Sequence, residues 1–432
     1  MTDKVLMSRM LGIEEPWRIV EVKLNLERRL LEVIVECVRQ EWGDENGRRI
    51  HLHGYEERQW RHLDAFQFQT IIRARVPRLR YPGEGPDDAG DDGTGTPQMG
   101  RTALLPVPWA ERGSRFTAFF EAWAMCVLQA CRSVAEGARL LNLTWDQAHG
   151  IMQRAVERGM ARRELTEITH VAIDEKSFGK GQSYGTLLSD PGGRRVLEVT
   201  PARDTAAGLA AIETLPAEQR EKIKSVSMDM SPAYQAAAAQ ALPGADVVFD
   251  RFHISKLLGE AVDKVRRAEH RQLTAQGDTR LKGTKYYWLE SPENMSAQRA
   301  QQFEEVFVRS LATARAWEVK ESFASFYEQP DAAAGREFAR TWLRRLAARK
   351  GMEAMKRAGE SIRRHLDGLL NWYEHRVSNA FSEGINSLVS VIKSGARGFR
   401  NFANYRTRIL FHHGKLDMTP HCAQASALFP LK

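Results

Sequence analysis

The sequence has few cysteines and no long apolar run. The first feature argues against a disulfide-stabilised protein, and the second argues against a membrane-spanning one. Its 432 residues include four cysteines without a C-x-x-C pair, namely Cys37, Cys126, Cys131 and Cys422. Such spacing argues against a disulfide framework and is typical of a reducing cytoplasm. No run of about 18 uncharged apolar residues occurs, so we expect neither a transmembrane span nor a membrane partner. The N-terminus leads into no long apolar segment, and no secretory signal is expected.

Two segments lack the spacing of the ligand-binding loops that their composition suggests. Residues 84–100 are rich in Asp and Gly, but D-x-[DN]-x-[DN]-G with a distal Glu is absent. We therefore expect an acidic, flexible linker over 86–100 rather than a calcium loop. Residues 179–183 lack the G-x-x-x-x-G-K-[ST] spacing of a phosphate-binding loop, and they predict a hairpin turn.

Positive charge is concentrated toward one end of the chain. The formal net charge is +8, and from Asp331 to Lys432 there are 18 Lys and Arg against 8 Asp and Glu. A basic block of this kind indicates a surface that binds a polyanion such as DNA. The alternative is a set of solvated helix faces.

The N-terminal part predicts a small β-rich module over 1–85. Residues 17–38 alternate apolar and polar side chains, which favours a hairpin that turns near 27–29. A second strand pair is expected over 58–63 and 70–80, where prolines mark its end.

Residues 116–163 are predicted to be helical, within a DNA-binding domain over 101–163. A short helix stops at Asn142, and Thr144 with Gln147 forms the pattern of a capping box for a second helix. That helix is expected to present Trp145, Gln147, His149 and Arg154 outward. The pattern indicates a helix-turn-helix, whose second helix enters the major groove. An ordinary helical hairpin in a bundle is the alternative.

From residue 167 onward the pattern changes to strands alternating with helices. Three strands form a meander over 170–174, 184–189 and 195–199, and two more follow at 223–229 and 246–250. Helices are expected over 204–215, 232–242 and 254–272, which makes the order that of an RNase H-like α/β core. Residues 274–370 read as a helical insertion, so the domain would run over 166–432.

Three acidic residues lie in or next to segments that are expected to be buried, where an unpaired carboxylate is unfavourable. Asp174 and Asp229 each end an apolar strand, and Glu383 lies on a predicted helix. A buried carboxylate needs a charged partner. Hard cations such as Mg²⁺ take oxygen ligands, and two ions about 3.5–4 Å apart can serve phosphodiester chemistry. The pattern therefore indicates a polynucleotidyl transferase.

Several ordered blocks together resemble a known family. They are Ile173-Asp174-Glu175, Met228–Ser231, Ser378–Ala380 leading to Glu383–Ser387, and Gly395–Phe402, with Trp60–Asp64 and Val107–Ala110 upstream. In these blocks the chain resembles the DDE transposases of bacterial insertion sequences, and within them the ISL-three family. The likeness covers most of the chain.

This resemblance implies roles for particular residues. Asp174, Asp229 and Glu383 would be the catalytic triad and the ligands of two Mg²⁺ (or Mn²⁺) ions. Asp250 and His253 match a D-x-x-H block and would support the site. The alternative is that Asp250 caps the following helix and that His253 packs there.

The chain departs from the family at its zinc ribbon. Cys37 stands at the first ligand pair, but Gln40 occupies the partner position, and the second pair falls at Tyr81 and Glu84. These residues cannot form a closed thiolate site, so zinc is not expected and the module would be a degenerate zinc ribbon. Substitution by His51 and His53 is the alternative.

The segment 397–413 interleaves aromatic residues with arginines. Phe399, Phe402, Ile409 and Leu410 have the spacing of core residues. Its arginines could face phosphate, and we expect Lys393, Arg397 and Arg400 to contact DNA near the cleavage site.

The function implied is transposition. The protein would bind the terminal inverted repeats of an insertion sequence, cleave double-stranded DNA with metal ions, and transfer the strand to target DNA. A homodimer on DNA is expected because two ends must be processed together, in the bacterial cytoplasm at the nucleoid. Two alternatives remain open: an RNase H-like structure-specific nuclease or resolvase, and a domesticated or inactive DNA-binding protein.

Overall fold

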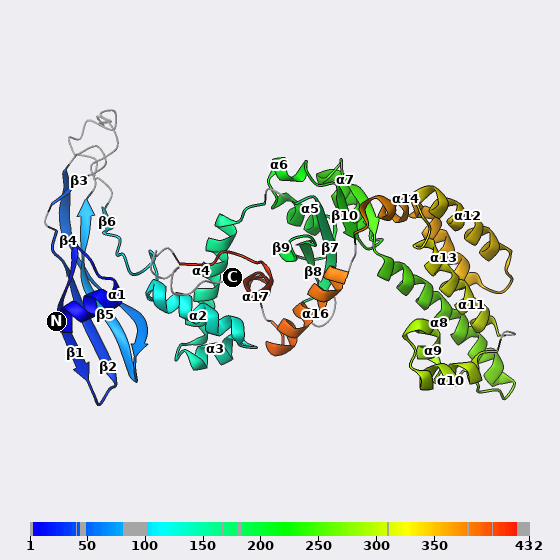
Figure 1. Ribbon diagram of the computed structural model, residues 1–432, viewed down its shortest axis with the longest axis horizontal. Helices are drawn as coiled ribbons and strands as arrows, with labels where there is room; N and C mark the ends of the chain where they lie inside the picture. The colour runs from blue at the N-terminus through cyan, green and yellow to red at the C-terminus, as the bar shows by residue number, and fades with distance from the viewer. Residues whose placement is uncertain are drawn as a thin grey trace, which may run out of the picture. The chain divides into compact units, whose positions relative to one another are not determined.

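The computed structural model describes residues 3–39, 41–43, 49–80, 102–165, 168–178, 184–308, 311–377, 380–399 and 401–420. The chain divides into two compact units, Met1–Arg163 with Leu416–Lys432, and Glu164–Lys415. Figure 1 shows the elements of both. The linker expected over 86–100 and the turn expected at 179–182 lie outside the described residues. Among the helices that the structure describes, none is long and apolar enough to cross a membrane.

The first unit begins with a helix and a six-stranded sheet. These elements are α1 (Asp3–Leu11), β1 (Trp17–Asn25), β2 (Leu30–Cys37), β3 (Trp42–Gly43), β4 (Arg49–Ala65), β5 (Phe68–Arg80) and β6 (Thr102–Leu104). The sheet order is β1-β2-β5-β4-β3, and β6 pairs with β5. The predicted hairpin is confirmed, because β1 and β2 pair antiparallel around a turn in which Arg29 has φ 50°. The second predicted pair, β4 with β5, is also confirmed, although β4 begins well before residue 58.

A tryptophan cluster forms the centre of this sheet's core. The rings of Trp17 and Trp60 each meet Trp109 edge-on, with centroids 5.0 and 5.5 Å apart. Val33 and Ile72, which the alternating pattern places on the inner face, are fully buried beside them. Edge-to-face aromatic pairs contribute about 0.5–1.5 kcal/mol each beyond the burial of their area. Hydrophobic packing therefore holds the β module together.

Three helices follow the sheet in the first unit, within the segment predicted to be helical. They are α2 (Ala118–Ala130), α3 (Val134–Leu140) and α4 (Trp145–Arg162). The predicted capping box is present: Thr144 accepts from the Gln147 backbone, and the Gln147 side chain accepts from the Thr144 backbone. Between α3 and α4 the chain turns through Asn142, whose φ of 52° is a left-handed conformation that Asn tolerates.

The segment 416–420 packs in the first unit, although the sequence analysis assigned it to a domain over 166–432. Arg158 of α4 donates from Nε to the carbonyl of Met418 at 2.9 Å, and Arg162 donates to the carbonyl of Thr419 at 2.6 Å. Gly159 permits this crossing, because a Cβ there would lie 2.6 Å from the Leu416 side chain. The described end of the chain is thus bound to α4.

The second unit is built on a mixed five-stranded sheet. Its strands are β7 (His170–Ser177), β8 (Tyr184–Asp190), β9 (Arg195–Pro201), β10 (Ser225–Met228) and β11 (Asp246–Phe249), in the order β11-β10-β7-β8-β9. The predicted antiparallel meander is confirmed as β7-β8-β9. β10 pairs parallel with β7, and β11 pairs parallel with β10, so these three strands end at the same edge.

Helices fill the connections of this sheet and form the long segment that follows it. They are α5 (Thr205–Glu213), α6 (Ala217–Arg220), α7 (Pro232–Ala241), α8 (Arg251–Ala275), α9 (Lys285–Leu289), η1 (Pro292–Asn294), α10 (Ala297–Val306), α11 (Ala312–Ser322), η2 (Phe323–Phe326), α12 (Ala332–Ala348), α13 (Glu353–Arg364), α14 (Leu366–Leu370), α15 (Trp372–His375), α16 (Ala380–Gly395) and α17 (Phe402–His413). The expectation of a mostly helical segment over 274–370 is confirmed. One hydrophobic core runs from the sheet into these helices. Figure 1 shows α16 and α17 back beside the strands of the sheet.

Candidate active site and DNA-binding elements

Three aspartates lie in register across the three parallel strands, Asp174 within β7 and Asp229 and Asp250 directly after β10 and β11. Ser227 of β10 pairs with Ala172 of β7, so continuing the register brings Asp229 opposite Asp174. Met228 pairs with Phe249 of β11, which brings Asp250 beside Asp229 in the same way. Neighbouring strands lie about 4.8 Å apart. The carboxyl edge of the sheet therefore gathers carboxylates from residues distant in the sequence.

The carboxylate of Asp174 is half-buried and accepts two hydrogen bonds. Its Oδ1 accepts the backbone N–H of Glu175 at 2.7 Å, and its Oδ2 accepts the side-chain amide of Asn386. Burial raises the pKa of Asp174, and the hydrogen bonds from Asn386 and Glu175 lower it in part. The electrostatic influence of His253 also lowers the pKa of Asp174, while the negative charge of Asp229 raises it. A cation at this position would favour the ionised carboxylate.

The other two aspartates lie close to the first residues of two helices. Asp229 Oδ1 accepts the backbone N–H of Ser231 at 2.9 Å, just before α7. Asp250 Oδ1 caps α8 by accepting the N–H of Phe252 at 2.8 Å, and its Oδ2 lies 3.6 Å from His253 Nε2. The helix-capping alternative for Asp250 is thus observed. Because Asp250 lies beside Asp229 in the sheet register, this pair also borders the other aspartates.

Glu383 lies in the first turn of α16, but its side chain lies outside the described residues. Asn386 follows it on the same helix and reaches Asp174 on β7. The first turns of α16 therefore lie against the strand that carries Asp174.

The basic residues proposed near the cleavage site have different surroundings. Lys393 donates from Nζ to the carbonyl of Ser177 at 2.9 Å and to its hydroxyl at 3.3 Å, which ties α16 to the end of β7. Arg397 is exposed, with a left-handed φ of 54°. Arg400 lies outside the described residues. Lys393 thus has a structural role, because it connects α16 to β7.

The arginines of α17 face the protein interior. Arg406 donates to both carboxylate oxygens of Glu198 on β9, at 2.5 and 2.7 Å. Arg408 is 3% exposed, and Ile409 and Leu410 are fully buried. The core interpretation of this helix is therefore correct, and these two arginines do not form a phosphate-facing row.

Two residues near the aspartates were missed in the sequence. Asn386 was noted only as part of a motif, although its spacing from Glu383 places both on one helical face. Tyr234 is buried among the alanines of α7, and its hydroxyl donates to Thr186 Oγ1 at 3.0 Å, which in turn donates to the Ala202 carbonyl at 2.9 Å. Burial and the charges of nearby carboxylates raise the pKa of Tyr234. Its position as the one aromatic residue in an alanine-rich helix was the available signal.

Two of the four residues expected to face outward on α4 do not. Trp145 is 42% exposed and Gln147 is exposed, although the Gln147 carbonyl serves the capping box. His149 is 7% exposed and stacks on Trp145 with ring centroids 4.7 Å apart. Arg154 donates to Glu121, a buried residue of α2. The expectation of outward presentation is therefore wrong for His149 and Arg154, because the α2–α4 packing takes up that face of the helix.

The candidate zinc ligands of the β module are scattered. Cys37 ends β2 and is half-buried, while His51 and His53 lie on β4 with exposed side chains. Arg80 lies 3.4 Å from His53 Nδ1. Gln40, Tyr81 and Glu84 lie outside the described residues.

Family profiles match three consecutive parts of the chain. A profile described as "Transposase", of the DDE type of ISL3, matches residues 171–409, which include Asp174, Asp229 and Glu383. The "Helix-turn-helix domain of transposase family ISL3" matches 105–156, and the "zinc-finger of transposase IS204/IS1001/IS1096/IS1165" matches 46–82. A helix-turn-helix followed by a DDE domain defines an insertion-sequence transposase. The chain belongs to the ISL3 family of these transposases.

Two curated relatives are similar over most of their length. The transposase for insertion sequence element IS1001 of Bordetella parapertussis is 26% identical over 355 residues, which cover 81% of this chain and 83% of the relative. The transposase for insertion sequence element IS1557 of Mycobacterium tuberculosis is 23% identical over 370 residues, covering 80% and 79%. The likeness thus extends beyond the DDE domain.

Proposed function

We propose that this transposase binds the terminal inverted repeats of its insertion sequence and catalyses metal-dependent strand cleavage and strand transfer, with Asp174, Asp229 and Glu383 as its catalytic residues. The observation that carries this proposal is the register that brings Asp229 opposite Asp174 at the edge of the sheet. The order of strands and helices in the second unit supports an RNase H-like fold.

The position of α16 supports the inclusion of Glu383. Residues three apart on a helix share a face. Asn386 meets Asp174, so that face of α16 is directed toward β7 at this point. We infer that Glu383 joins the two aspartates from the helix side.

The donor set fits Mg²⁺ or Mn²⁺, because each of the three residues offers carboxylate oxygens. When bound, two such ions activate the attacking water or 3′-hydroxyl and stabilise the departing 3′-oxygen. In this chain, Asn386 orients the Asp174 carboxylate, and Asp250, paired with His253, lies beside Asp229 in the sheet register. No Ser or Tyr nucleophile is required, so no covalent protein–DNA intermediate is proposed.

DNA contact is assigned to two surfaces, one in each unit. On α4, the exposed Trp145 and Gln147 are the candidates for the major groove. Lys393, Arg397 and Arg400 are the candidates for the phosphates near the cleavage site. His149 and Arg154, which pack inside the first unit, would support α4 rather than touch bases. We expect two copies of the chain to act together, because two transposon ends must be joined to one target.

We further propose that the β module works without zinc. The region that matches the zinc-finger profile, 46–82, contains no cysteine in this chain. Closed structural zinc sites use four thiolate or imidazole ligands. The tryptophan cluster around Trp109 supplies a hydrophobic core instead.

The change Asp174→Asn tests the proposed catalytic site. This variant should lose Mg²⁺-dependent cleavage of the transposon end by at least about 100-fold, because an amide is a poor ligand for the cation. Binding to the end should be unchanged, since Asp174 lies on the sheet and not on α4. Glu213→Gln, an exposed acid-to-amide change on α5, serves as the matched control and should cleave normally.

Gel-shift and nicking assays on one preparation measure both properties. Full cleavage by Asp174→Asn would remove Asp174 from the catalytic residues. Cleavage by the wild type without strand transfer would instead indicate a nuclease or resolvase.

A further inference from the structure

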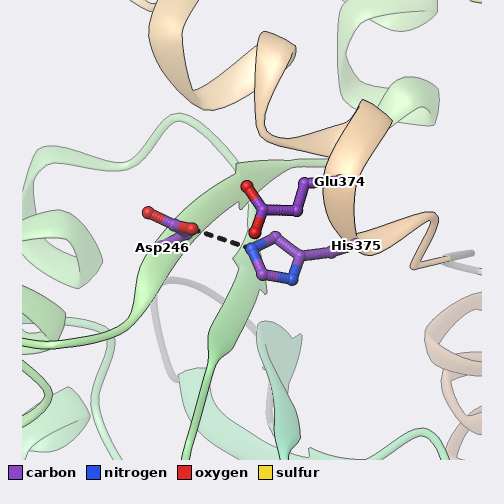
Figure 2. Close-up of side chains that lie close together, drawn as sticks. All are labelled: Asp246, Glu374 and His375. Atoms are coloured by element: carbon purple, nitrogen blue, oxygen red, sulfur yellow. Dashed lines mark hydrogen bonds and ion pairs between the residues drawn. The ribbon is translucent and has the colours of Figure 1, made fainter. Parts of the chain in front are cut away.

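A compact group of possible metal-ligand side chains lies at the amino ends of the parallel strands, away from the three aspartates. Asp246 begins β11, and Glu374 and His375 end α15. Their ligand atoms all lie within 4.8 Å of one another, and His375 Nε2 is 2.8 Å from Asp246 Oδ2. Figure 2 shows both carboxylates directed toward the same nitrogen of the His375 ring. Within the described part of the chain, no other group of three His, Cys, Asp or Glu side chains meets this distance criterion.

The two elements that carry these ligands are tightly packed together. Gly368 of α14 approaches β11 so closely that a Cβ there would lie 2.4 Å from the Phe249 ring. Asn371 donates from its side-chain amide to the carbonyl of Val247 at 3.0 Å. Backbone and packing therefore hold α15 against β11, and the ligands project from elements with little freedom to separate. Sites on such elements are better preorganised than sites on loops.

A second imidazole borders the group. His170, the first residue of β7, has its ring centroid 5.7 Å from that of His375. Its Nδ1 lies 2.7 Å from Ser225 Oγ, which holds the ring in place. Ser225 pairs with both His170 and Asp246 across the sheet, so the first residues of three parallel strands converge here.

We propose that Asp246, Glu374 and His375 bind a divalent transition-metal ion of the zinc type. Imidazole with two carboxylates suits Zn²⁺, whereas Mg²⁺ prefers oxygen ligands alone. Zinc bonds of about 2.0–2.2 Å require the donor atoms to rearrange slightly around the ion. The exposed carboxylates of Asp246 and Glu374 can do so by changing rotamers. The ion would also neutralise two like charges that otherwise face each other.

The position of the site suggests its purpose. α15 ends the helical segment that follows the sheet, and the chain then runs to α16, which carries Glu383 and Asn386. An ion bound between β11 and α15 would hold the end of the helical segment against the sheet, just before α16 begins. The site is separate from the proposed catalytic carboxylates, which lie near the other end of β7. Its existence does not depend on the proposed function.

Zinc titration of the full-length protein by calorimetry tests the proposal. The titration is done with saturating Mg²⁺, to occupy the catalytic carboxylates, and near pH 7.5, where imidazole is a competent ligand. The wild type should bind one more equivalent of Zn²⁺ than His375→Ala, or bind it at least about tenfold more tightly. Zinc should also raise the wild-type melting temperature by a few degrees and fail to do so in the variant.

Control variants separate this site from others. Asp246→Asn, which preserves side-chain shape, should lose the same equivalent, so the result does not depend on the larger change at His375. His270→Ala on α8 is the matched histidine control and should bind zinc as the wild type does. Asp174→Asn should also keep this equivalent while losing cleavage. Equal zinc stoichiometry and affinity in the wild type, His375→Ala and Asp246→Asn would overturn the proposal.

Discussion

At the scale of single residues, the buried Asp174 carboxylate shows how the proposed site is prepared for a cation. Burial works against its ionised form, and hydrogen bonds from Glu175 and Asn386 work in favour of it. Burial has the largest effect and raises the pKa of Asp174, and the Asn386 amide lowers it more than the Glu175 N–H does. Asn386 thus positions Asp174 and offsets part of the effect of burial on its pKa, without itself being a proposed ligand.

We therefore expect Asn386→Ala to shift the pH dependence of cleavage. Loss of a hydrogen bond to the carboxylate raises the pKa of Asp174 further, so the ionised form appears only at higher pH. The acid limb of the rate profile should move to higher pH, while end binding stays constant. Ser390→Ala, one turn further along α16, is a matched control, because its hydroxyl bonds only to the Asn386 carbonyl within the helix. An unmoved acid limb would assign Asn386 a purely structural role.

At the scale of elements, α4 combines a turn proposed to contact DNA with a face that packs against its neighbours. Its N-terminal turn is exposed through Trp145, whereas Arg154 faces α2 and meets Glu121, whose side chain is 1% exposed. Ser114 donates to the same Glu121 oxygen at 2.8 Å. The ion pair is therefore part of the packing between α2 and α4.

Arg154→Met should reduce the free energy of unfolding by about 1–3 kcal/mol, because the buried Glu121 carboxylate loses its strongest hydrogen-bond donor. Urea unfolding of the full-length protein measures this, and Gln153→Ala, an exposed neighbour on α4, should change it little. Affinity for DNA, compared under conditions where both variants are folded, should be nearly unchanged. If the variant were as stable as the wild type but bound DNA weakly, Arg154 would be assigned to the DNA-contacting surface instead.

At the scale of the whole molecule, the β module and helices α2–α4 form one compact unit. Arg61 of β4 exchanges backbone hydrogen bonds of 2.9 Å with Arg115 and Thr117, and His62 Nδ1 lies 2.8 Å from Thr117 Oγ1. Burial, aided by the positive charge of Arg61, lowers the pKa of His62 from 6.5 to about 4. The junction between sheet and helices thus contains a histidine that is neutral in the folded protein.

This histidine should make the first unit sensitive to acid. Its folded pKa lies below its unfolded pKa, so its contribution to stability is complete above pH 6.5 and is lost as the pH falls toward about 4. The loss should be at most about 3–4 kcal/mol, at about 1.4 kcal/mol for each pKa unit. Unfolding of His62→Gln should show a weaker dependence on pH over this window. His51→Gln, an exposed histidine of the same strand, should keep the wild-type dependence, and identical curves for all three proteins would contradict this account.

Local patterns in the sequence were enough to predict the order of elements. The alternation of residues 17–38 predicted the first hairpin, and Thr144 with Gln147 predicted where α4 begins, because capping and strand alternation act over a few residues. Local patterns likewise predicted the β7-β8-β9 meander and the helices α5, α7 and α8 that follow it. Asp174 and Asp229 were picked out because a carboxylate at the end of an apolar strand is costly without a partner.

Only the tertiary structure decided which distant groups meet. Asp174 and Asn386 are 212 residues apart in the sequence, and Asp246 and His375 are 129 apart. Sheet register and helix packing bring such pairs together, and a single sequence carries no local signal of either. For the same reason, the burial of His149 and the pairing of Arg154 with Glu121 could not be read from the helical pattern of α4. The sequence by itself determined the elements and their acidic ends, whereas long-range packing determined which side chains could act together.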